Sequence, residues 1–125
     1  MDTDVLIIGG GIVGLACAVE SAGLRQKTLL VERHESFGQE TSSRNSEVIH
    51  SGIYYPTGSL KARLCVAGNK TTYADCARLG VWNRQCGKLV VATNESELPR
   101  LHELLNRGNK NGLQGIKLLN QEEMR

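Results

Sequence analysis

Aromatic residues are scarce in this chain of 125 residues, which contains one Trp, one Phe and three Tyr, so a core must be built from aliphatic side chains. Concentrated positive charge is also lacking. The formal net charge is +2 and no basic run occurs, which gives no reason to expect a nucleic-acid partner. The apolar runs are too short to cross a bilayer, so no transmembrane segment is predicted, and peripheral association with a membrane is left open.

Closely spaced cysteines are absent too, because Cys17, Cys65, Cys76 and Cys86 lie far apart in the sequence. Such spacing suits neither a zinc site nor a CxxC redox motif, so we expect no metal site and interpret the cysteines as buried, reduced thiols. A positively charged leader is missing before the first apolar run, which argues against a signal peptide. With 40% hydrophobic and 22% charged residues, the composition predicts a soluble globular protein in the reducing cytoplasm.

The first 32 residues have the pattern of a β-α-β unit. Residues 4–8 and 27–31 are short apolar runs, typical of strands buried on both faces. Between them, apolar residues recur at the spacing of one helix face before Gly23: these are Leu15, Ala18, Val19 and Ala22. A right-handed crossover would make the two strands parallel.

A glycine-rich turn joins the first predicted strand to this helix. Gly9, Gly11 and Gly14 form the GxGxxG pattern, in which the glycines allow a tight turn, backbone approach to a pyrophosphate and close helix–strand packing, in that order. The helix N-terminus offers unpaired N–H groups to the phosphates. Glu32 follows the second strand, where its carboxylate would accept hydrogen bonds from a ribose and repel a 2′-phosphate. This pattern predicts a dinucleotide site that disfavours NADP, and it does not separate NAD from FAD.

The remaining sequence predicts a long loop followed by mixed elements. Residues 33–58 have no periodicity, and a helix is expected from the N-cap Ser59 to Leu79. A later helix contains Pro99 in its first turn, which favours Ser96 over Asn94 as its cap. Residues 81–85 and 88–93, separated by Gly87, are expected to form two short strands or one kinked strand, and residues 116–119 a further short strand.

The chain is expected to be the N-terminal piece of a longer protein. Two strands do not make a stable doubly wound sheet, and the spacing of Asn120 and Glu123 is typical of a capping box that opens another helix. The predicted fold class is α/β. It comprises the N-terminal part of a Rossmann-like FAD-binding domain in residues 1–80, followed by the start of an α+β substrate domain in residues 81–125.

The segment VERHESFGQETSSRNSEVIHSGIYY resembles the D-amino-acid-oxidase-like superfamily of FAD-dependent oxidoreductases, which includes glycerol-3-phosphate dehydrogenases with a similar Ser-Ser-Arg run. Within that superfamily, SSRNSEVIHSGIYYPTGSLKARLCVAG is most similar to the L-2-hydroxyglutarate dehydrogenase/oxidase family, and GKLVVAT followed by ELPRL continues the similarity. The resemblance covers essentially the whole chain. It implies noncovalent FAD, a small 2-hydroxy acid as substrate, and oxygen or a quinone as electron acceptor.

The resemblance also implies roles for many of the polar residues of the long loop. Arg33 would lie at the adenine end of FAD, and Glu32 on the adenosine ribose. The pyrophosphate would be held by the three glycines with Thr41 and Ser42, and the ribityl chain approached by Ser43, Arg44 and Asn45. His50, Ser51 and Gly52 would reach the isoalloxazine ring. An extended cofactor that needs many separate polar contacts explains the irregular composition of this loop.

Several alternatives remain open at the level of sequence. His50 is interpreted as a catalytic base or a direct flavin contact, since histidine titrates near neutral pH, or as a loop residue hydrogen-bonded to backbone. In a third interpretation the base comes from a part of the protein outside these 125 residues. Arg44 would bind a phosphate or a substrate carboxylate, or form an ion pair with Glu40 or Glu47. Tyr54 and Tyr55 would line a substrate cavity or pack as half-buried residues.

The function implied by the resemblance is FAD-dependent oxidation of L-2-hydroxyglutarate to 2-oxoglutarate. The alternatives are an enzyme of the same superfamily acting on an amino acid, glycerol phosphate or another 2-hydroxy acid, and a non-catalytic nucleotide-binding module. The 125-residue chain by itself is expected to be inactive, because the missing strands would complete both the cofactor site and the substrate site.

Overall fold

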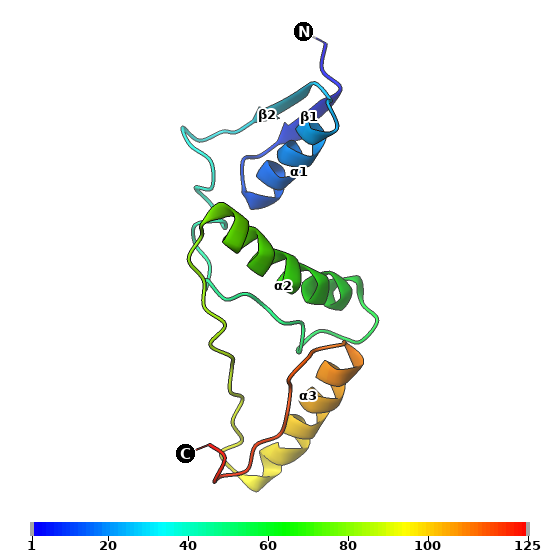
Figure 1. Cartoon of the computed structure of the whole chain (residues 1–125), viewed down its shortest axis with the longest axis vertical. Coiled ribbons are helices and arrows are strands. Elements are labelled where there is room, and N and C mark those ends of the chain that lie inside the picture. Colours follow the sequence, from blue (N-terminus) through cyan, green and yellow to red (C-terminus); the bar gives the residue numbers. More distant parts are fainter. Residues whose placement is uncertain (1, 125) are drawn as a thin grey trace. The chain divides into compact units, whose positions relative to one another are not determined.

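The computed structural model describes residues 2–124 (Figure 1). The chain divides into two compact units, Met1–Val48 and Ile49–Arg125, called here the first and second units. No helix within residues 2–124 combines the length and the apolar composition needed to cross a membrane.

The first unit contains the predicted β-α-β element and the part of the long loop that ends at Val48. Strands β1 (Val5–Ile8) and β2 (Thr28–Val31) pair in parallel, with Val5 opposite Thr28 and Ile8 opposite Val31. Helix α1 (Ile12–Gly23) connects them and packs against both strands. The sequence prediction of two parallel strands joined by a helix that ends at Gly23 is therefore confirmed.

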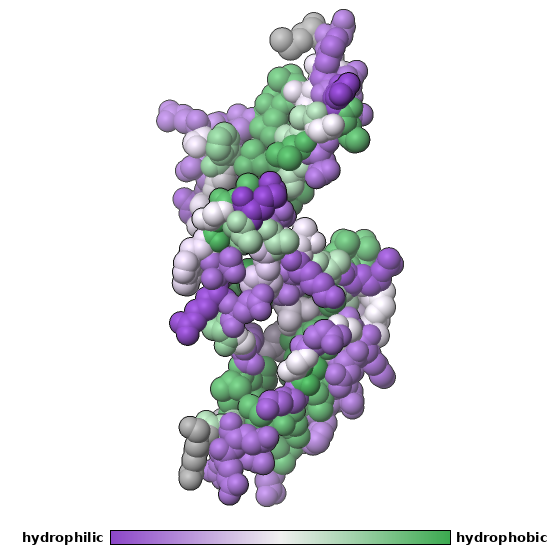
Figure 2. All heavy atoms as spheres, in the orientation of Figure 1, coloured by the Kyte–Doolittle hydropathy of each residue, from purple (hydrophilic) through white to green (hydrophobic). Residues whose placement is uncertain are grey.

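Only one face of this two-stranded sheet is covered within the first unit, so the prediction of strands buried on both faces is wrong for the unit as it stands. Val5 and Ile7 are half-buried on one face, whereas Leu6 and Ile8 on the other are 56% and 83% exposed. Leu29 and Val31 of β2 continue the open face. No helix or strand of the first unit packs against that face within the described residues. Hydrophobic residues are therefore exposed at the molecular surface (Figure 2).

The second unit contains two long helices. Helix α2 (Leu60–Leu79) begins as predicted, because the Ser59 side chain accepts a hydrogen bond from the Ala62 N–H at 3.1 Å, and it ends at Gly80 in the left-handed conformation. Helix α3 (Leu98–Lys110) has Pro99 in its first turn. Ser96 does not cap it, however, because the 3₁₀ turn η1 (Glu95–Glu97) comes first and Asn94 precedes that turn.

The short strands predicted in the second unit are not formed. Residues 81–92 and 116–120 have no ladder partner, and β1 and β2 are the strands found within residues 2–124. Strand geometry needs a neighbouring strand to receive its backbone hydrogen bonds, and these segments have none. Apolar side chains of residues 88–92 and 116–119 instead line, with α3, a hollow of about 350 Å³, to which Leu89, Val91, Leu101, Leu104 and Ile116 contribute.

Asn120 and Glu123 form the predicted capping box. The Glu123 carboxylate accepts a hydrogen bond from the Asn120 N–H at 2.8 Å, and Asn120 Oδ1 accepts one from the Glu123 N–H at 3.0 Å. The capping box predicted from the spacing of these two residues is therefore confirmed.

The cysteines are free, as predicted, but they are less buried than predicted. Cys17 and Cys86 are exposed, and Cys65 and Cys76 are half-buried. Burial raises the pKa of the Cys65 thiol, against a smaller opposing effect of Lys61. The exposed thiols follow from the small core, since Ala62 and Leu104 are the buried hydrophobic residues among those described.

Asn111 ties the loop before α2 to the end of α3. Its side-chain amide donates to the carbonyl oxygens of Gly52 and Tyr55 at 2.9 and 3.0 Å. Arg107 adds a bond to the Tyr54 carbonyl at 3.4 Å. These bonds hold the backbone that follows His50.

We expect Asn111→Ala to lower the free energy of unfolding of the second unit by about 1–3 kcal/mol, because two partly buried carbonyl groups lose their donor. Urea unfolding of the full-length protein, followed by hydrogen exchange at residues 52–55, measures the change. Asn109→Ala is the matched control, since Asn109 is exposed on the same helix. Equal stability of the two variants would contradict the assigned role of Asn111.

Candidate cofactor site

The glycine-rich turn has the geometry that the GxGxxG pattern predicts. Gly9 has a backbone φ of +104°, which residues other than glycine rarely adopt. Its N–H donates to the Val31 carbonyl at 2.8 Å. A Cβ atom at Gly14 would lie 2.0 Å from the Gly9 carbonyl oxygen. Gly9 thus permits the turn and Gly14 permits helix α1 to lie against it.

Glu32 lies at the end of β2 and binds the turn directly. Its carboxylate accepts hydrogen bonds from the Gly10 N–H at 2.6 Å and from the His34 N–H at 2.9 Å. The backbone N–H of His34, and next that of Gly10, hold the pKa of Glu32 below its ordinary value, so the group is ionised at neutral pH. Each carboxylate oxygen keeps a further lone pair, which leaves acceptor capacity for a ribose hydroxyl.

Gly10 was not assigned a role by the GxGxxG pattern, yet it is the central residue of this arrangement. It is buried, its N–H donates to Glu32, and its carbonyl accepts from the Gly38 N–H at 3.0 Å. A Cβ atom would lie 3.1 Å from the Glu32 carboxylate and 3.2 Å from Phe37 Cβ. The signal in the sequence was the run of three glycines at residues 9–11. The GxGxxG pattern requires only the first and the third of them, and Gly10 is the additional one.

The turn and the end of β2 border a hollow of about 500 Å³. Its lining consists of Ile8, Gly9, Gly11, Val31, Glu32, Arg33 and Glu40. The groups of this region suit the sugar and phosphates of a dinucleotide. Backbone N–H donors are available at the N-terminus of α1, beside glycines without Cβ atoms, and the ionised Glu32 carboxylate is an acceptor for ribose hydroxyls. The residues present therefore fit the adenosine and pyrophosphate portion of FAD.

Ser42 is brought to the same turn from further along the chain. Its Oγ accepts a hydrogen bond from the Ile12 N–H at 2.9 Å, at the start of α1, where Gly11 has no side chain to supply a cap. A Cβ atom at Gly11 would lie 3.2 Å from this oxygen. The structure therefore places Ser42 beside Gly11. The sequence analysis had related the two residues only as predicted ligands of the same pyrophosphate.

The neighbouring residues of the long loop organise its backbone. Asn45 donates to the Ser42 carbonyl at 3.1 Å and accepts from the Glu47 N–H at 2.8 Å. The Ser43 hydroxyl donates to the Glu40 carbonyl at 3.1 Å, and Thr41 is exposed. These contacts shape the loop, and the predicted cofactor contacts of Thr41, Ser43 and Asn45 stay predictions.

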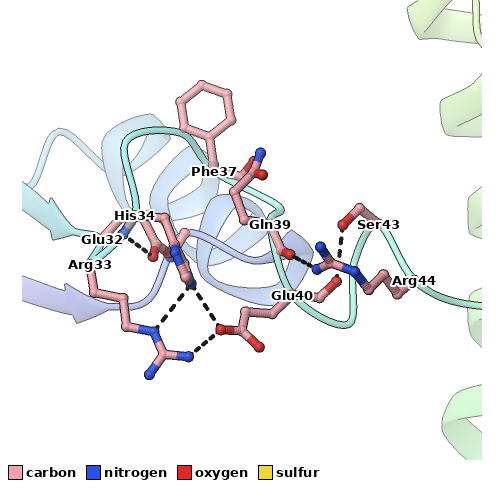
Figure 3. A network of polar contacts seen from close by, with 9 residues as sticks. Glu32, Arg33, His34, Phe37, Gln39, Glu40, Ser43 and Arg44 are labelled. Atoms are coloured by element: carbon pink, nitrogen blue, oxygen red, sulfur yellow. Dashed lines mark hydrogen bonds and ion pairs between the residues drawn. The ribbon is translucent and has the colours of Figure 1, made fainter.

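The two arginines of the loop have different partners (Figure 3). Arg33 forms an ion pair with Glu40, whereas Arg44 donates to the Gln39 carbonyl. Within residues 2–124, Arg44 forms an ion pair with neither Glu40 nor Glu47, so that alternative is wrong for this structure. Its phosphate or carboxylate role stays a prediction.

His50, Ser51 and Gly52 belong to the second unit. The His50 carbonyl accepts from Asn69 Nδ2 at 3.1 Å and from Cys65 Sγ at 3.4 Å, which fixes its backbone to α2. In the described part of the chain its imidazole forms no hydrogen bond, and the residue is exposed. Tyr55 lies beneath Lys61, whose Nζ is 4.5 Å from the ring centre. Residues 2–124 contain no group of His, Cys, Asp and Glu able to hold a metal ion.

A family model described as FAD dependent oxidoreductase matches residues 4–125. The chain belongs to this family. FAD is the cofactor of the family, in agreement with the nucleotide-binding geometry of the first unit. The predicted fold class is confirmed by the same match and by the structural comparison that follows.

Several similar proteins are named L-2-hydroxyglutarate dehydrogenase. The chain is 46% identical to the mitochondrial protein of Bos taurus over 98% of its own length and 27% of the relative's. For the protein of Indibacter alkaliphilus the identity is 40%, over 100% of this chain and 32% of the relative. The chain thus spans about a quarter to a third of the length of these relatives.

A solved structure gives the same result at the level of the fold. The chain is similar to L-alpha-glycerophosphate oxidase from Mycoplasma pneumoniae, determined with FAD bound, with a TM-score of 0.82 and 36% identity. The match covers 99% of this chain and 33% of that one. The β-α-β unit and the loop after it therefore have a counterpart in a flavoprotein of known structure.

Proposed function

We propose that this chain is the N-terminal part of an enzyme that oxidises L-2-hydroxyglutarate to 2-oxoglutarate. The observation that supports this substrate is the identity of 40–46% to L-2-hydroxyglutarate dehydrogenases of a mammal and a bacterium over nearly the whole chain. Noncovalently bound FAD would supply the acceptor for the hydride that leaves the substrate carbon. Residues 1–80 would belong to the FAD-binding domain and residues 81–125 to the start of the substrate domain.

The first unit would hold the adenosine and pyrophosphate portion of the cofactor. Gly9, Gly11 and Gly14 keep the backbone free of Cβ atoms beside the N-terminus of α1, whose N–H groups are suited to phosphate oxygens. Glu32 would accept hydrogen bonds from the ribose hydroxyls, and Arg33 would lie at the adenine end. Thr41, Ser42, Ser43, Arg44 and Asn45 would extend the polar lining along the cofactor.

His50 would accept the hydroxyl proton of the substrate, with Ser51 and Gly52 beside it. Two hydrogen bonds from α2 fix the His50 carbonyl. The imidazole is exposed and has no partner within residues 2–124, so both ring nitrogens are available for a proton acceptor role. Histidine suits the task because its ordinary pKa lies near neutral pH.

A glycerol phosphate is the second candidate substrate, because the FAD-containing structural relative is a glycerophosphate oxidase. Anaerobic mixing of the full-length protein with each compound separates the candidates through the visible absorption of the flavin. We expect bleaching with L-2-hydroxyglutarate and none with its D-enantiomer or with glycerol 3-phosphate. Bleaching with glycerol 3-phosphate alone would replace the proposed substrate and keep the proposed cofactor.

His50→Ala is expected to slow reduction of the flavin by about 10²- to 10⁴-fold, because proton removal loses its base. FAD content should stay that of the unsubstituted protein. His102→Ala, an exposed histidine on α3, is the matched control and should leave both quantities unchanged. A parallel loss of FAD content and reduction rate in His50→Ala would make His50 a cofactor contact and not the base.

The electron acceptor and the compartment belong to the same proposal. Oxygen or a quinone would reoxidise the enzyme, and comparing reoxidation rates with each decides between them. The cytoplasm was predicted from the cysteines, whereas the name of the Bos taurus relative places that protein in mitochondria. Fractionation of cells that express the full-length protein distinguishes the two compartments.

A further inference from the structure

We propose that Glu40 is a second determinant of nucleotide specificity in the first unit, because its ion pair with Arg33 keeps the adenosine pocket from accepting a 2′-phosphate. This inference rests on the proposed nucleotide-binding role of the hollow beside the glycine-rich turn. Glu32 is the acidic residue that the sequence pattern assigns to the ribose. Glu40 lies outside that pattern and was recognised only from its place in the structure.

Glu40 and Arg33 line the same hollow as Glu32. The Glu40 carboxylate contacts the Arg33 guanidinium and lies 2.8 Å from His34 Nε2 (Figure 3). Arg33 Nε also lies 3.2 Å from the same His34 nitrogen, which cannot donate to Glu40 and accept from Arg33 at once. With its hydrogen on Nε2, His34 would donate to Glu40 and be a second donor to that carboxylate, after Arg33.

The backbone places Glu40 beside the turn independently of its side chain. The Gly38 N–H donates to the Gly10 carbonyl at 3.0 Å, so the loop returns to the glycine-rich turn just before Glu40. The Glu40 carbonyl then accepts from the Ser43 N–H at 3.1 Å. With both bonds formed, the carboxylate stands at the rim of the hollow, where Arg33 and His34 reach it.

The charges around the hollow explain the expected selectivity. Glu32 and Glu40 contribute two negative charges and Arg33 one positive charge, so the three side chains together are negative. A guanidinium without a carboxylate partner is the group that accommodates the 2′-phosphate in NADP sites. Glu40 occupies Arg33 and leaves a net repulsion for a phosphate on the ribose 2′ position.

The size of the effect is limited by exposure. The Arg33 and Glu40 side chains are 75% and 59% exposed, so water and salt screen their charges. The pair therefore adjusts selectivity and does not create affinity. A salt-dependent change in the preference between two nucleotides is the expected signature.

The test uses full-length protein stripped of FAD, with ADP and 2′-phospho-ADP as probes and displacement of rebound FAD as the measurement. Glu40→Gln is expected to raise the affinity for 2′-phospho-ADP relative to ADP by about two- to fivefold at low salt, and less at high salt. Glu35→Gln is the matched control, since Glu35 is exposed in the same loop and does not line the hollow. Its ratio should equal that of the unsubstituted protein.

Arg33→Gln keeps the proposal testable if Glu40→Gln does not fold, because it should shift the ratio in the opposite direction. An unchanged ratio in Glu40→Gln, in a protein that still rebinds FAD, would overturn the role of Glu40 alone. An unsubstituted protein that binds neither FAD nor ADP would overturn the proposed cofactor site, and the role of Glu40 with it.

Discussion

Full-length protein with Gly14→Ala is expected to be purified without bound FAD. A Cβ atom at this position would lie 2.0 Å from the Gly9 carbonyl oxygen and 3.4 Å from Ile7 Cγ2. The first obstacle is backbone, so it cannot rotate away as a side chain would. Helix α1 must move from β1 or the turn must open, which we expect to cost about 3 kcal/mol or more. The visible spectrum and the thermal midpoint of the purified variant measure the two effects.

Gly23→Ala is the control for this substitution. Gly23 is the last residue of the same helix, and a Cβ atom there would meet nothing within 4 Å. This variant should retain its FAD and its thermal midpoint. A yellow Gly14→Ala protein with the stability of Gly23→Ala would show that close packing of α1 on the turn is not required for the cofactor site.

Glu32→Ala is expected to weaken FAD binding by about tenfold or more, because an ionised acceptor of ribose hydroxyls is lost together with the ties to Gly10 and His34. Equilibrium dialysis of the full-length protein against FAD measures the change. Glu35→Ala removes an exposed carboxylate from the same loop and should bind FAD like the unsubstituted protein. Equal affinities in the two variants would remove Glu32 from the site.

The pKa of Glu32 adds a dependence on pH with a definite sign. Backbone N–H groups of His34 and Gly10 lower this pKa in the folded protein below the ordinary value of 4.5. The resulting stabilisation is present above 4.5 and is lost as the pH falls through the lower folded-state value. Glu32→Gln should lack this part of the acid sensitivity.

The β-α-β unit was predictable because each of its signals is local. Buried-strand runs, one helix face and a glycine pattern specify β1, α1 and β2 without reference to the remaining chain. Ser59 and the Asn120–Glu123 pair were predictable for the same reason, since a cap depends on residues within one turn. These are the places where the sequence prediction and the structure agree.

The predicted strands at residues 81–93 and 116–119 failed for a reason that is not local. Their composition favours extended backbone, and the backbone is without helix there, but a ladder needs a partner strand. The exposed face of β1 has the same origin, because Leu6 and Ile8 need a second layer. A chain that spans a quarter to a third of its relatives' length contains such signals without the segments that they pair with.

In the candidate site, too, the local features were predictable from the sequence and the non-local ones were not. Gly9, Gly14 and Glu32 were assigned from spacing alone, and the structure gives each a contact that fits. Gly10 and Glu40 were not assigned, because their contacts join residues that no pattern links. Glu40 in particular shares the hollow with Arg33, and the Gly38–Gly10 hydrogen bond returns the loop to the turn just before it.

The most direct test of the central claim is the nucleotide content of the full-length protein. Acid denaturation followed by chromatography identifies what is released. We predict a yellow protein that releases a stoichiometric amount of intact FAD, as noncovalent binding in the first unit requires. A colourless protein that binds NAD in place of FAD would contradict the account, because the glycine-rich turn would then belong to a different kind of dinucleotide site.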